Sequence, residues 1–309
     1  MPAAYAHITL VNILKEPQRL QQIPGFPRSA IPAILDYFKF CELGAVSPDY
    51  PYLAIGDSGA ATWADVMHYK KTVEKIRVGV RHLRELSGEP QRKCLAWLLG
   101  YAAHVATDVA IHPVVFLKVG PYAQNKGAHR FCEMQQDAYI FQRLNLGGLG
   151  LSEHLRSGIW ACHAPGDPGR LDRDVDALWQ RMLQETHPEE YAANPPDPDT
   201  WRRRFELVVD DIADEGDKLL PFARHVAAGL GLVYPAEAEV SAEFTRGLTV
   251  PTGHQDYDQV FDAAIRDVGT VWEWVASAVL VGDVPQLVQA GNWDLDTGRD
   301  EHDQLVFWG

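Results

Sequence analysis

The sequence is short of cysteine and of positive charge. Its four cysteines, Cys41, Cys94, Cys132 and Cys162, are scattered without a CxxC pair, so we expect buried thiols and no disulfide framework. Lysine and arginine number 28 against 42 aspartates and glutamates, which gives a net charge of −14. Such a surface does not attract nucleic acid over long distances, and no stable nucleic-acid binding is expected. A phosphate-bearing substrate would need local positive charge, which a bound cation can supply.

The sequence also lacks a recognisable secretory signal and an obvious membrane span. The first residues, MPAAYAHITLVNILKEPQRL, have no basic start, no long apolar stretch and no small-residue cleavage site. We find no apolar run that is long enough to cross a bilayer. The sequence therefore predicts a cytoplasmic protein, secreted only if a signal has been removed, and not an integral membrane protein.

The regular secondary structure is predicted to be helical. Hydrophobic residues make up 46% of the 309 residues, which is enough for a buried core. Apolar residues recur at intervals of three and four, and few runs alternate between apolar and polar residues. Helices are expected at 11–23, 29–41, 58 or 62 to 86, 90–115, 128–144, 175–185, 201–230 and 255–281, with loops at 43–62, 118–127, 163–174 and 187–200.

One stretch, GYAAHVATDVAIHP at 100–113, places His104, Asp108 and His112 at intervals of four. Positions four apart lie on nearly the same face of a helix, about 6 Å apart along its axis. One ion can bind His104 together with Asp108, whereas the two histidines, about 12 Å apart, cannot easily share an ion. The spacing predicts two neighbouring ions, with Asp108 between them and able to bridge.

The next predicted helix repeats the pattern in AHRFCE, where His129 and Glu133 are four apart. Two antiparallel helices would bring this pair beside His112 and create a second site. Imidazole and carboxylate ligands suit zinc, which takes about four of them at about 2.0–2.2 Å. Other divalent metals bind the same ligand types, so the ligands alone do not decide which metal is bound.

Three upstream residues are candidates for additional roles at this site. His68 lies on a predicted helix, His7 lies near the start of another, and Asp49 lies in a loop from which a carboxylate can reach an open metal face. Asp65 and Asp137 are candidates to orient the imidazoles. A single histidine on a helix is usually an ordinary surface or core residue. The row of His104, Asp108 and His112 and the pair of His129 and Glu133 both lie in apolar stretches, where an unpaired charge is costly. They therefore favour a metal site instead.

Two other classes of metal protein fit the sequence less well. An HD-type phosphohydrolase needs an adjacent His–Asp pair in its core, and the only such pair, His302–Asp303, lies in a polar tail. A ferritin-like di-iron bundle would use Glu-x2-His spacing, which the helices with the metal motifs lack.

The motifs together resemble the zinc-dependent phospholipase C family, whose superfamily includes the S1/P1-type nucleases. The resemblance rests on HITLVNIL, ELGAVSPDYPY, His68, GYAAHVATDVAIHP and HRFCE, and covers roughly the first 145 residues. It implies an all-α, multi-helix metallohydrolase fold with irregular loops. We expect a metal-binding helical core at 1–160 and a helical remainder at 161–309 that packs on it within the same domain.

The resemblance also implies roles for individual residues. Asp49 matches the PD pair of the family and would be the general base. His7 would join a third site, with Asp108 bridging. The well-studied secreted members use the amine of an N-terminal Trp as a ligand, whereas this chain starts Met-Pro-Ala, so two or three zinc ions are expected. The first ion would be bound by His68, His104 and Asp108, and the second by His112, His129 and Glu133.

The implied reaction is hydrolysis of a phosphodiester by metal-activated water, with a phosphate ester such as a phospholipid as the substrate. Two alternatives stay open. One is an S1/P1-type nuclease, against which the negative charge counts. The other is a non-catalytic, metal-stabilised helical module that binds a protein partner. The second half of the chain carries no recognised motif, and it leaves the substrate and the oligomeric state open.

Overall fold

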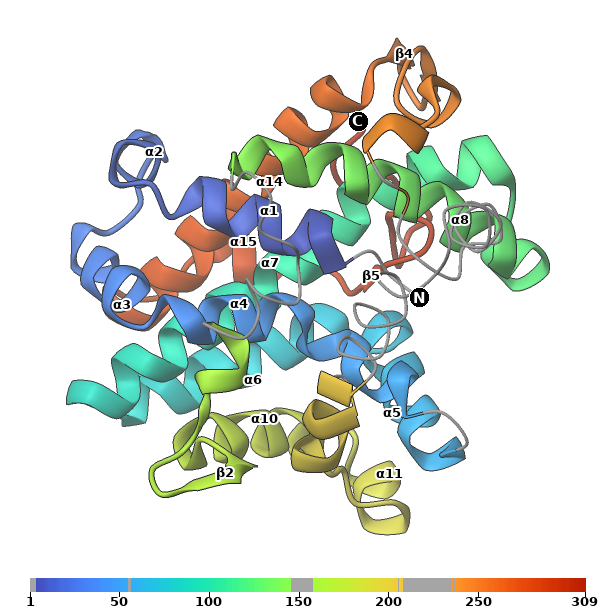
Figure 1. Ribbon diagram of the computed structural model, residues 1–309. Coiled ribbons are helices and arrows are strands. Elements are labelled where there is room, and N and C mark those ends of the chain that lie inside the picture. Colours follow the sequence, from blue (N-terminus) through green and yellow to red (C-terminus); the bar gives the residue numbers. More distant parts are fainter. Residues whose placement is uncertain (1–3, 55–56, 146–157, 205, 208–234, 236) are drawn as a thin grey trace.

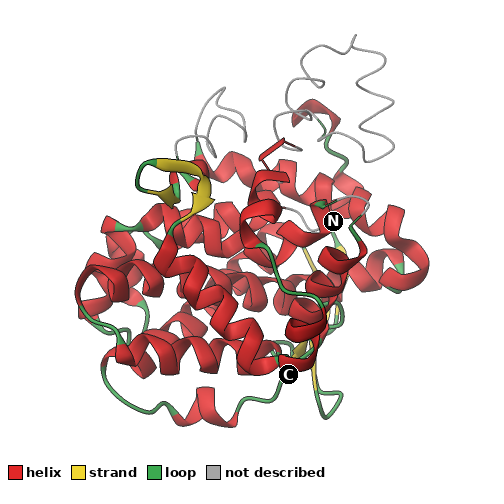
Figure 2. Ribbon diagram, turned by 90° about the horizontal axis from the view of Figure 1, so that it is seen from below, coloured by secondary structure: helices red, strands yellow, loops and turns green. Residues whose placement is uncertain are grey.

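The protein is built almost entirely from α-helices, which confirms the predicted fold class. The computed structural model describes residues 4–54, 57–145, 158–204, 206–207, 235 and 237–309 (Figure 1). Within these residues, strands occur only in three small antiparallel pairs, and helices dominate the view in Figure 2. The α-helices are α1 (Ala4–Leu14), α2 (Pro17–Gln22), α3 (Ile31–Asp36), α4 (Phe38–Val46), α5 (Ser58–Tyr69), α6 (Thr72–Glu85), α7 (Gly88–Val119), α8 (Tyr122–Phe141), α10 (Arg173–Thr186), α11 (Pro188–Ala193), α14 (Tyr257–Leu280) and α15 (Pro285–Gln289). The strand pairs are β1 (His163–Ala164) with β2 (Asp167–Leu171), β3 (Leu248–Val250) with β4 (Gly253–Gln255), and β5 (Trp293–Asp294) with β6 (Arg299–Asp300).

Helix α7 forms the centre of the fold (Figure 1). It has 32 residues and packs most extensively against α4 and α14, with further contacts to α6, α8 and α10. By length and composition α7 could cross a membrane, so the expectation that no apolar run is long enough was wrong. Its most apolar window is completely buried inside the protein, which is the environment of a core helix.

Two glycines bring the backbones of α4 and α7 into contact. A Cβ atom on Gly44 of α4 would lie 2.1 Å from the carbonyl oxygen of Trp97, and a Cβ atom on Gly100 of α7 would lie 2.0 Å from that of Cys41. Both distances are far below van der Waals contact, so only glycine permits this approach. Because α4 leads directly into the 3₁₀ helix η2 (Ser47–Leu53), the contact also fixes where the η2 side chains lie.

The helix expected to end at residue 86 is divided into α5 and α6 at Lys71, which has the left-handed backbone conformation. The fully buried Lys75 of α6 lies at this break, where its ammonium group donates to the carbonyl oxygens of Val66, at 2.8 Å, and Lys70. Carbonyl groups at the end of a helix outnumber the N–H groups available to them; that of Val66 already accepts the backbone N–H of Lys70 at 3.2 Å, and the lysine adds a second donor. The contact thereby fixes the last turn of α5, which contains His68.

Several predicted loops contain short helices or strands. Pro17 begins a separate helix, so residues 11–23 hold the end of α1 and all of α2. The expected helix at 201–230 lies largely outside the described residues. The predicted loops at 43–62, 118–127, 163–174 and 187–200 contain, in that order, the end of α4 with η2, the start of α8, the β1–β2 hairpin and α11.

The C-terminal half of the chain packs on the helices that carry the metal motifs. Helix α14 lies along α7, and the indole N–H of Trp272 donates to the carbonyl oxygen of Leu99 at 2.8 Å. Strand β5 lies against the start of α6, where the hydroxyl group of Thr72 bonds to both backbone groups of Trp293 at 2.8 Å. The end of the chain is therefore held close to α5, α6 and α7.

Candidate metal centre

Asp108 lies between two histidines of its own helix, α7. Its Oδ2 atom is 3.1 Å from Nε2 of His104, one turn earlier. Its Oδ1 atom is 3.7 Å from Nε2 of His112, one turn later. The two imidazoles therefore face different oxygens of one carboxylate, as the intervals of four predicted.

Asp49 and His68 complete a first group of donor atoms around His104. Nε2 of His68 is 3.2 Å from Oδ1 of Asp49, 3.4 Å from Nε2 of His104 and 3.9 Å from Oδ2 of Asp108. Nε2 of His104 is 3.7 Å from the same Asp49 oxygen. The donor atoms of Asp49, His68 and His104 all lie within 4.8 Å of one another, as do those of His7, His104 and Asp108, so each set of three could hold an ion.

A second group forms where α7 meets α8. The Oε1 atom of Glu133 is 3.7 Å from Nε2 of His112 and 3.8 Å from Nδ1 of His129. His129 and Glu133 lie one turn apart on α8, and α8 packs against α7. The structure therefore brings the HRFCE motif beside His112.

His7 approaches Asp108 from α1. Its Nε2 atom is 3.2 Å from Oδ1 of Asp108, and its ring stacks on that of His104 with centroids 4.2 Å apart. The buried carboxylate of Asp137 fixes the start of α1, because it accepts two backbone N–H groups of the first turn, each at 2.9 Å. Asp137 therefore positions the helix that carries His7.

Backbone carbonyl groups orient four of the imidazoles. A carbonyl oxygen only accepts hydrogen bonds, so each contact fixes the ring proton on that nitrogen and leaves the other nitrogen free to bind a cation. The expectation that Asp65 or Asp137 would orient an imidazole was wrong, since Asp65 instead accepts the hydroxyl group of Tyr52 at 3.1 Å. The four contacts join Nδ1 of His68 to Ala64 (2.8 Å), Nδ1 of His104 to Ala45 (2.9 Å), Nδ1 of His112 to Leu295 (2.7 Å) and Nε2 of His129 to Gly120 (2.6 Å).

The charges at this centre favour a bound cation. Burial opposes ionisation of Asp108, but His104, His112 and His7 outweigh it and hold the pKa of Asp108 well below its usual range. Burial also opposes protonation of His104, but Asp108 and Asp49 raise the pKa of His104 to about 9. The pKa of His7 is lowered, by burial and by its neighbour His104. Asp108 is therefore ionised and attracts positive charge, and the raised pKa of His104 means that a metal ion would have to displace a proton from this ring.

The atoms left without partners at the centre fit a metal ion. Nδ1 of His7, Oδ2 of Asp49 and Oε2 of Glu133 are buried and have no hydrogen-bond partner in the described part of the chain, and Oδ2 of Asp108 faces the Nε2 atoms of His104 and His68. Such atoms are costly unless something binds them. Two ligands of a tetrahedral zinc ion lie about 3.4 Å apart when each bond is about 2.0–2.1 Å. Asp49, His68 and His104, whose donor atoms are 3.2–3.7 Å apart, come near this geometry.

The end of the chain contributes residues that the sequence did not reveal. Leu295 supplies the carbonyl group that orients His112, and the carboxylate of Asp296 accepts the hydroxyl group of Tyr69 at 2.8 Å. A carbonyl group, or an isolated aspartate far along the chain, gives no signal in a single sequence. A cavity of about 20 Å³ next to the second group is lined by Tyr52, His68, Tyr69, His112, Tyr122, Glu133 and Asp296.

The structure therefore brings all eight predicted site residues together, and their roles stay predictions. Comparison with known proteins adds one finding. A family model described as zinc dependent phospholipase C matches residues 6–189, more than half of the 309-residue chain. No curated protein and no solved structure gives a significant match. The match contains every candidate ligand and extends beyond the metal motifs to the start of α11.

Proposed function

Because the chain belongs to the zinc-dependent phospholipase C family and is therefore a zinc-dependent phosphoric ester hydrolase, we propose that the group around Asp108 is its catalytic centre. The observation that supports this most directly is the position of Asp108. Its two oxygens face imidazole nitrogens of different histidines, and carbonyl groups hold the opposite nitrogens of His104 and His112. Such a carboxylate can join two adjacent ions.

We assign the donor atoms to two ions that share Asp108. His7 could hold a third ion together with His104 and Asp108, but that ion would share both of these residues with the first site. We therefore expect two tightly bound zinc ions and a third that is removed at a lower chelator concentration. The first ion would be held by Asp49, His68, His104 and Asp108, and the second by Asp108, His112, His129 and Glu133.

Zinc at this centre would withdraw charge from the phosphoryl oxygens and lower the pKa of the attacking water. The residues of the chain position the groups and move the proton. Asp49 directs Oδ1 toward His68, while its Oδ2 atom is buried without a hydrogen-bond partner in the described residues. Oδ1 of Asp49 would bind the first ion, and we assign Oδ2 as the acceptor of the proton released by the attacking water.

The substrate class that we propose is a phosphodiester of a lipid head group. The family supports a phosphate ester, and the net charge of −14 counts against a polyanionic nucleic acid. Metal analysis combined with a substrate panel tests this choice. Hydrolysis of phosphatidylcholine or a chromogenic choline phosphodiester, abolished by chelator, is the expected result.

Variants separate the metal centre from the fold. Asp108→Asn preserves the shape of the side chain but removes the bridging charge, and it should lose both zinc and hydrolysis. His302→Gln removes an exposed imidazole outside the centre and should retain both. Hydrolysis of single-stranded DNA or RNA alone would exclude the lipid substrate. A full zinc content without hydrolysis of any substrate would favour the metal-stabilised interaction module.

A further inference from the structure

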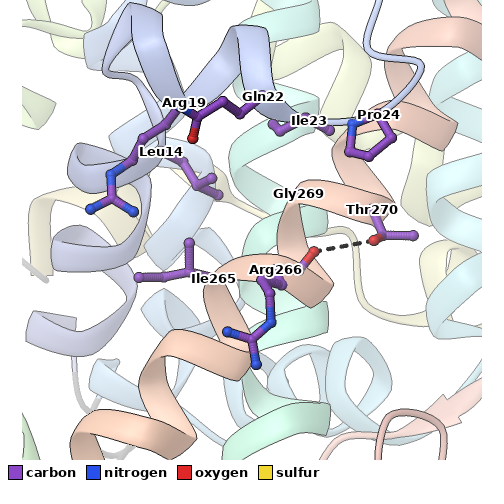
Figure 3. A pocket seen from close by; sticks show the side chains of 9 residues that line it. All are labelled: Leu14, Arg19, Gln22, Ile23, Pro24, Ile265, Arg266, Gly269 and Thr270. Atoms are coloured by element: carbon purple, nitrogen blue, oxygen red, sulfur yellow. Dashed lines mark hydrogen bonds between the residues drawn. The ribbon is translucent and has the colours of Figure 1, made fainter.

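A second pocket, of about 420 Å³, lies between α2 and α14 (Figure 3). Its volume falls in the range of ligand-binding pockets, about 300–1,000 Å³. None of its lining residues belongs to the metal centre. Leu14, at the end of α1, lines the pocket, while His7 lies about 10 Å away along the axis of the same helix.

One part of the pocket is apolar. Leu14, Ile23, Pro24 and Ile265 provide the side chains of this part. Gly269 of α14 contributes only backbone, and a Cβ atom at that position would lie 3.4 Å from Ile23. The walls therefore form a surface on which an alkyl chain can lie.

Two arginines give the pocket the opposite sign of charge from the protein as a whole. Arg19 comes from α2 and Arg266 from α14, and no aspartate or glutamate lines the pocket, although the net charge of the chain is −14. Figure 3 shows both guanidinium groups pointing away from Pro24 and Thr270, with Ile265 between them in this view. Arg19 forms an exposed ion pair with Glu16, at 3.2 Å, and no other with the described residues; such pairs are weak.

Arg266 is the better anion-binding group of the two arginines. Among the described residues it forms no ion pair within 4.0 Å, although its charge acts on the pKa of its sequence neighbour Asp267 and opposes the effect of burial there. Guanidinium groups bind carboxylate and phosphate through paired hydrogen bonds. An acidic group that enters the pocket can therefore bind Arg266 without displacing a partner.

We propose that this pocket binds a single-chain anionic amphiphile. Its alkyl chain lies against Leu14, Ile23 and Ile265, and its carboxylate or phosphate binds Arg266. A fatty acid is the simplest molecule of this class, and an alkyl phosphate has the same two parts. The proposal does not depend on the substrate of the metal centre.

Calorimetric titration of the zinc-loaded full chain with decanoate, below its critical micelle concentration, tests the proposal. Decyl phosphate forms the second arm, and decanol is the uncharged control. We expect both anions to bind about tenfold or more tightly than decanol. Arg266→Gln should weaken decanoate binding about tenfold. Arg92→Gln, the same charge change at an exposed position of α7, should leave it unchanged.

A second variant tests the apolar part of the pocket. Thr270→Trp adds bulk from an exposed position of α14 and should abolish binding. Unchanged binding in both Arg266→Gln and Thr270→Trp, or equal affinity for decanoate and decanol, would overturn the proposal. Binding to phosphatidylglycerol vesicles without binding of monomeric decanoate would overturn it in favour of a membrane contact. Thermal midpoint and zinc content show whether each variant is folded.

Discussion

The backbone contact between α4 and α7 leads to a strong prediction for Gly100→Ala. The new Cβ atom would lie 2.0 Å from the carbonyl oxygen of Cys41, where ordinary contact requires about 3.4 Å. No side-chain rotation can relieve the clash, because both atoms belong to helix backbones or are attached directly to them. The helices must separate by more than about 1 Å. Overpacking costs about 1–3 kcal/mol, and more when backbone must move, so we expect a loss of about 3–5 kcal/mol in unfolding free energy.

The same shift should impair the metal centre. Helix α4 contains Ala45, whose carbonyl oxygen is 2.9 Å from Nδ1 of His104, and α4 leads into η2 with Asp49. Moving α4 away from α7 lengthens that hydrogen bond and draws Asp49 away from His68. A displacement of about 1 Å at a catalytic group costs about 100-fold in rate. We therefore expect Gly100→Ala to lose the zinc ion of the first group and about 100-fold or more of its phosphodiesterase activity.

Gly127→Ala is the matched control for this experiment. Gly127 lies on an exposed part of α8, and a Cβ atom there would meet no atom within 4 Å. Alanine should stabilise the helix there by about 0.5–1 kcal/mol. Urea unfolding followed by circular dichroism, zinc content and phosphodiester hydrolysis are measured for both variants. A Gly100→Ala protein with the parental midpoint and zinc content would refute the proposed contact.

Three further substitutions test single interactions. Lys75→Met removes the donor from the last carbonyl groups of α5 and should lower the unfolding free energy by about 2–4 kcal/mol in urea titrations; a parental midpoint would contradict this role. Asp137→Asn removes one charged acceptor at the start of α1 and should lower the unfolding free energy by about 1 kcal/mol. It should also weaken the binding of the zinc ion nearest His7 in chelator titrations, and unchanged zinc retention would argue against a positioning role. Burial raises the pKa of Asp267 to about 6 from 3.8, so the folded state is penalised increasingly as pH rises through this interval. Asp267→Asn should therefore stabilise the protein by about 1–3 kcal/mol at pH 7.5 but little at pH 4, and equal gains at both pH values in thermal unfolding would exclude this cause.

The metal motifs could be found in the sequence because their geometry is local. Residues four apart on a helix have a fixed separation whatever surrounds them, so His104, Asp108 and His112 needed only a helix to become a row. The same holds for His129 and Glu133 on α8. The all-α fold class was predictable for a related reason, since apolar periodicity records which face of each helix is buried.

Other parts of the site depend on contacts between distant segments. The position of Asp49 follows from the approach of Gly44 to Gly100, and two glycines among 25 carry no visible signal that they are neighbours. The carbonyl group of Leu295 orients His112 from 183 residues away, and every residue of the chain has such a group. The division between α5 and α6 likewise depends on a lysine whose partners are backbone atoms. Single-sequence patterns record side-chain types, so they cannot identify contacts made by the backbone.

The choice of carbonyl groups as partners for the imidazoles has an electrostatic consequence. With the two zinc ions proposed above, four positive charges would meet three negative ones from the carboxylates of Asp49, Asp108 and Glu133. Neutral carbonyl partners add no charge, so these ligands would leave a small positive excess inside a chain with a net charge of −14. Carboxylate partners at the same places, as the sequence had suggested for Asp65 and Asp137, would reverse that sign. A positive centre attracts the phosphate of a substrate that the rest of the acidic surface repels. It would thus supply the local positive charge that a phosphate-bearing substrate needs in this chain.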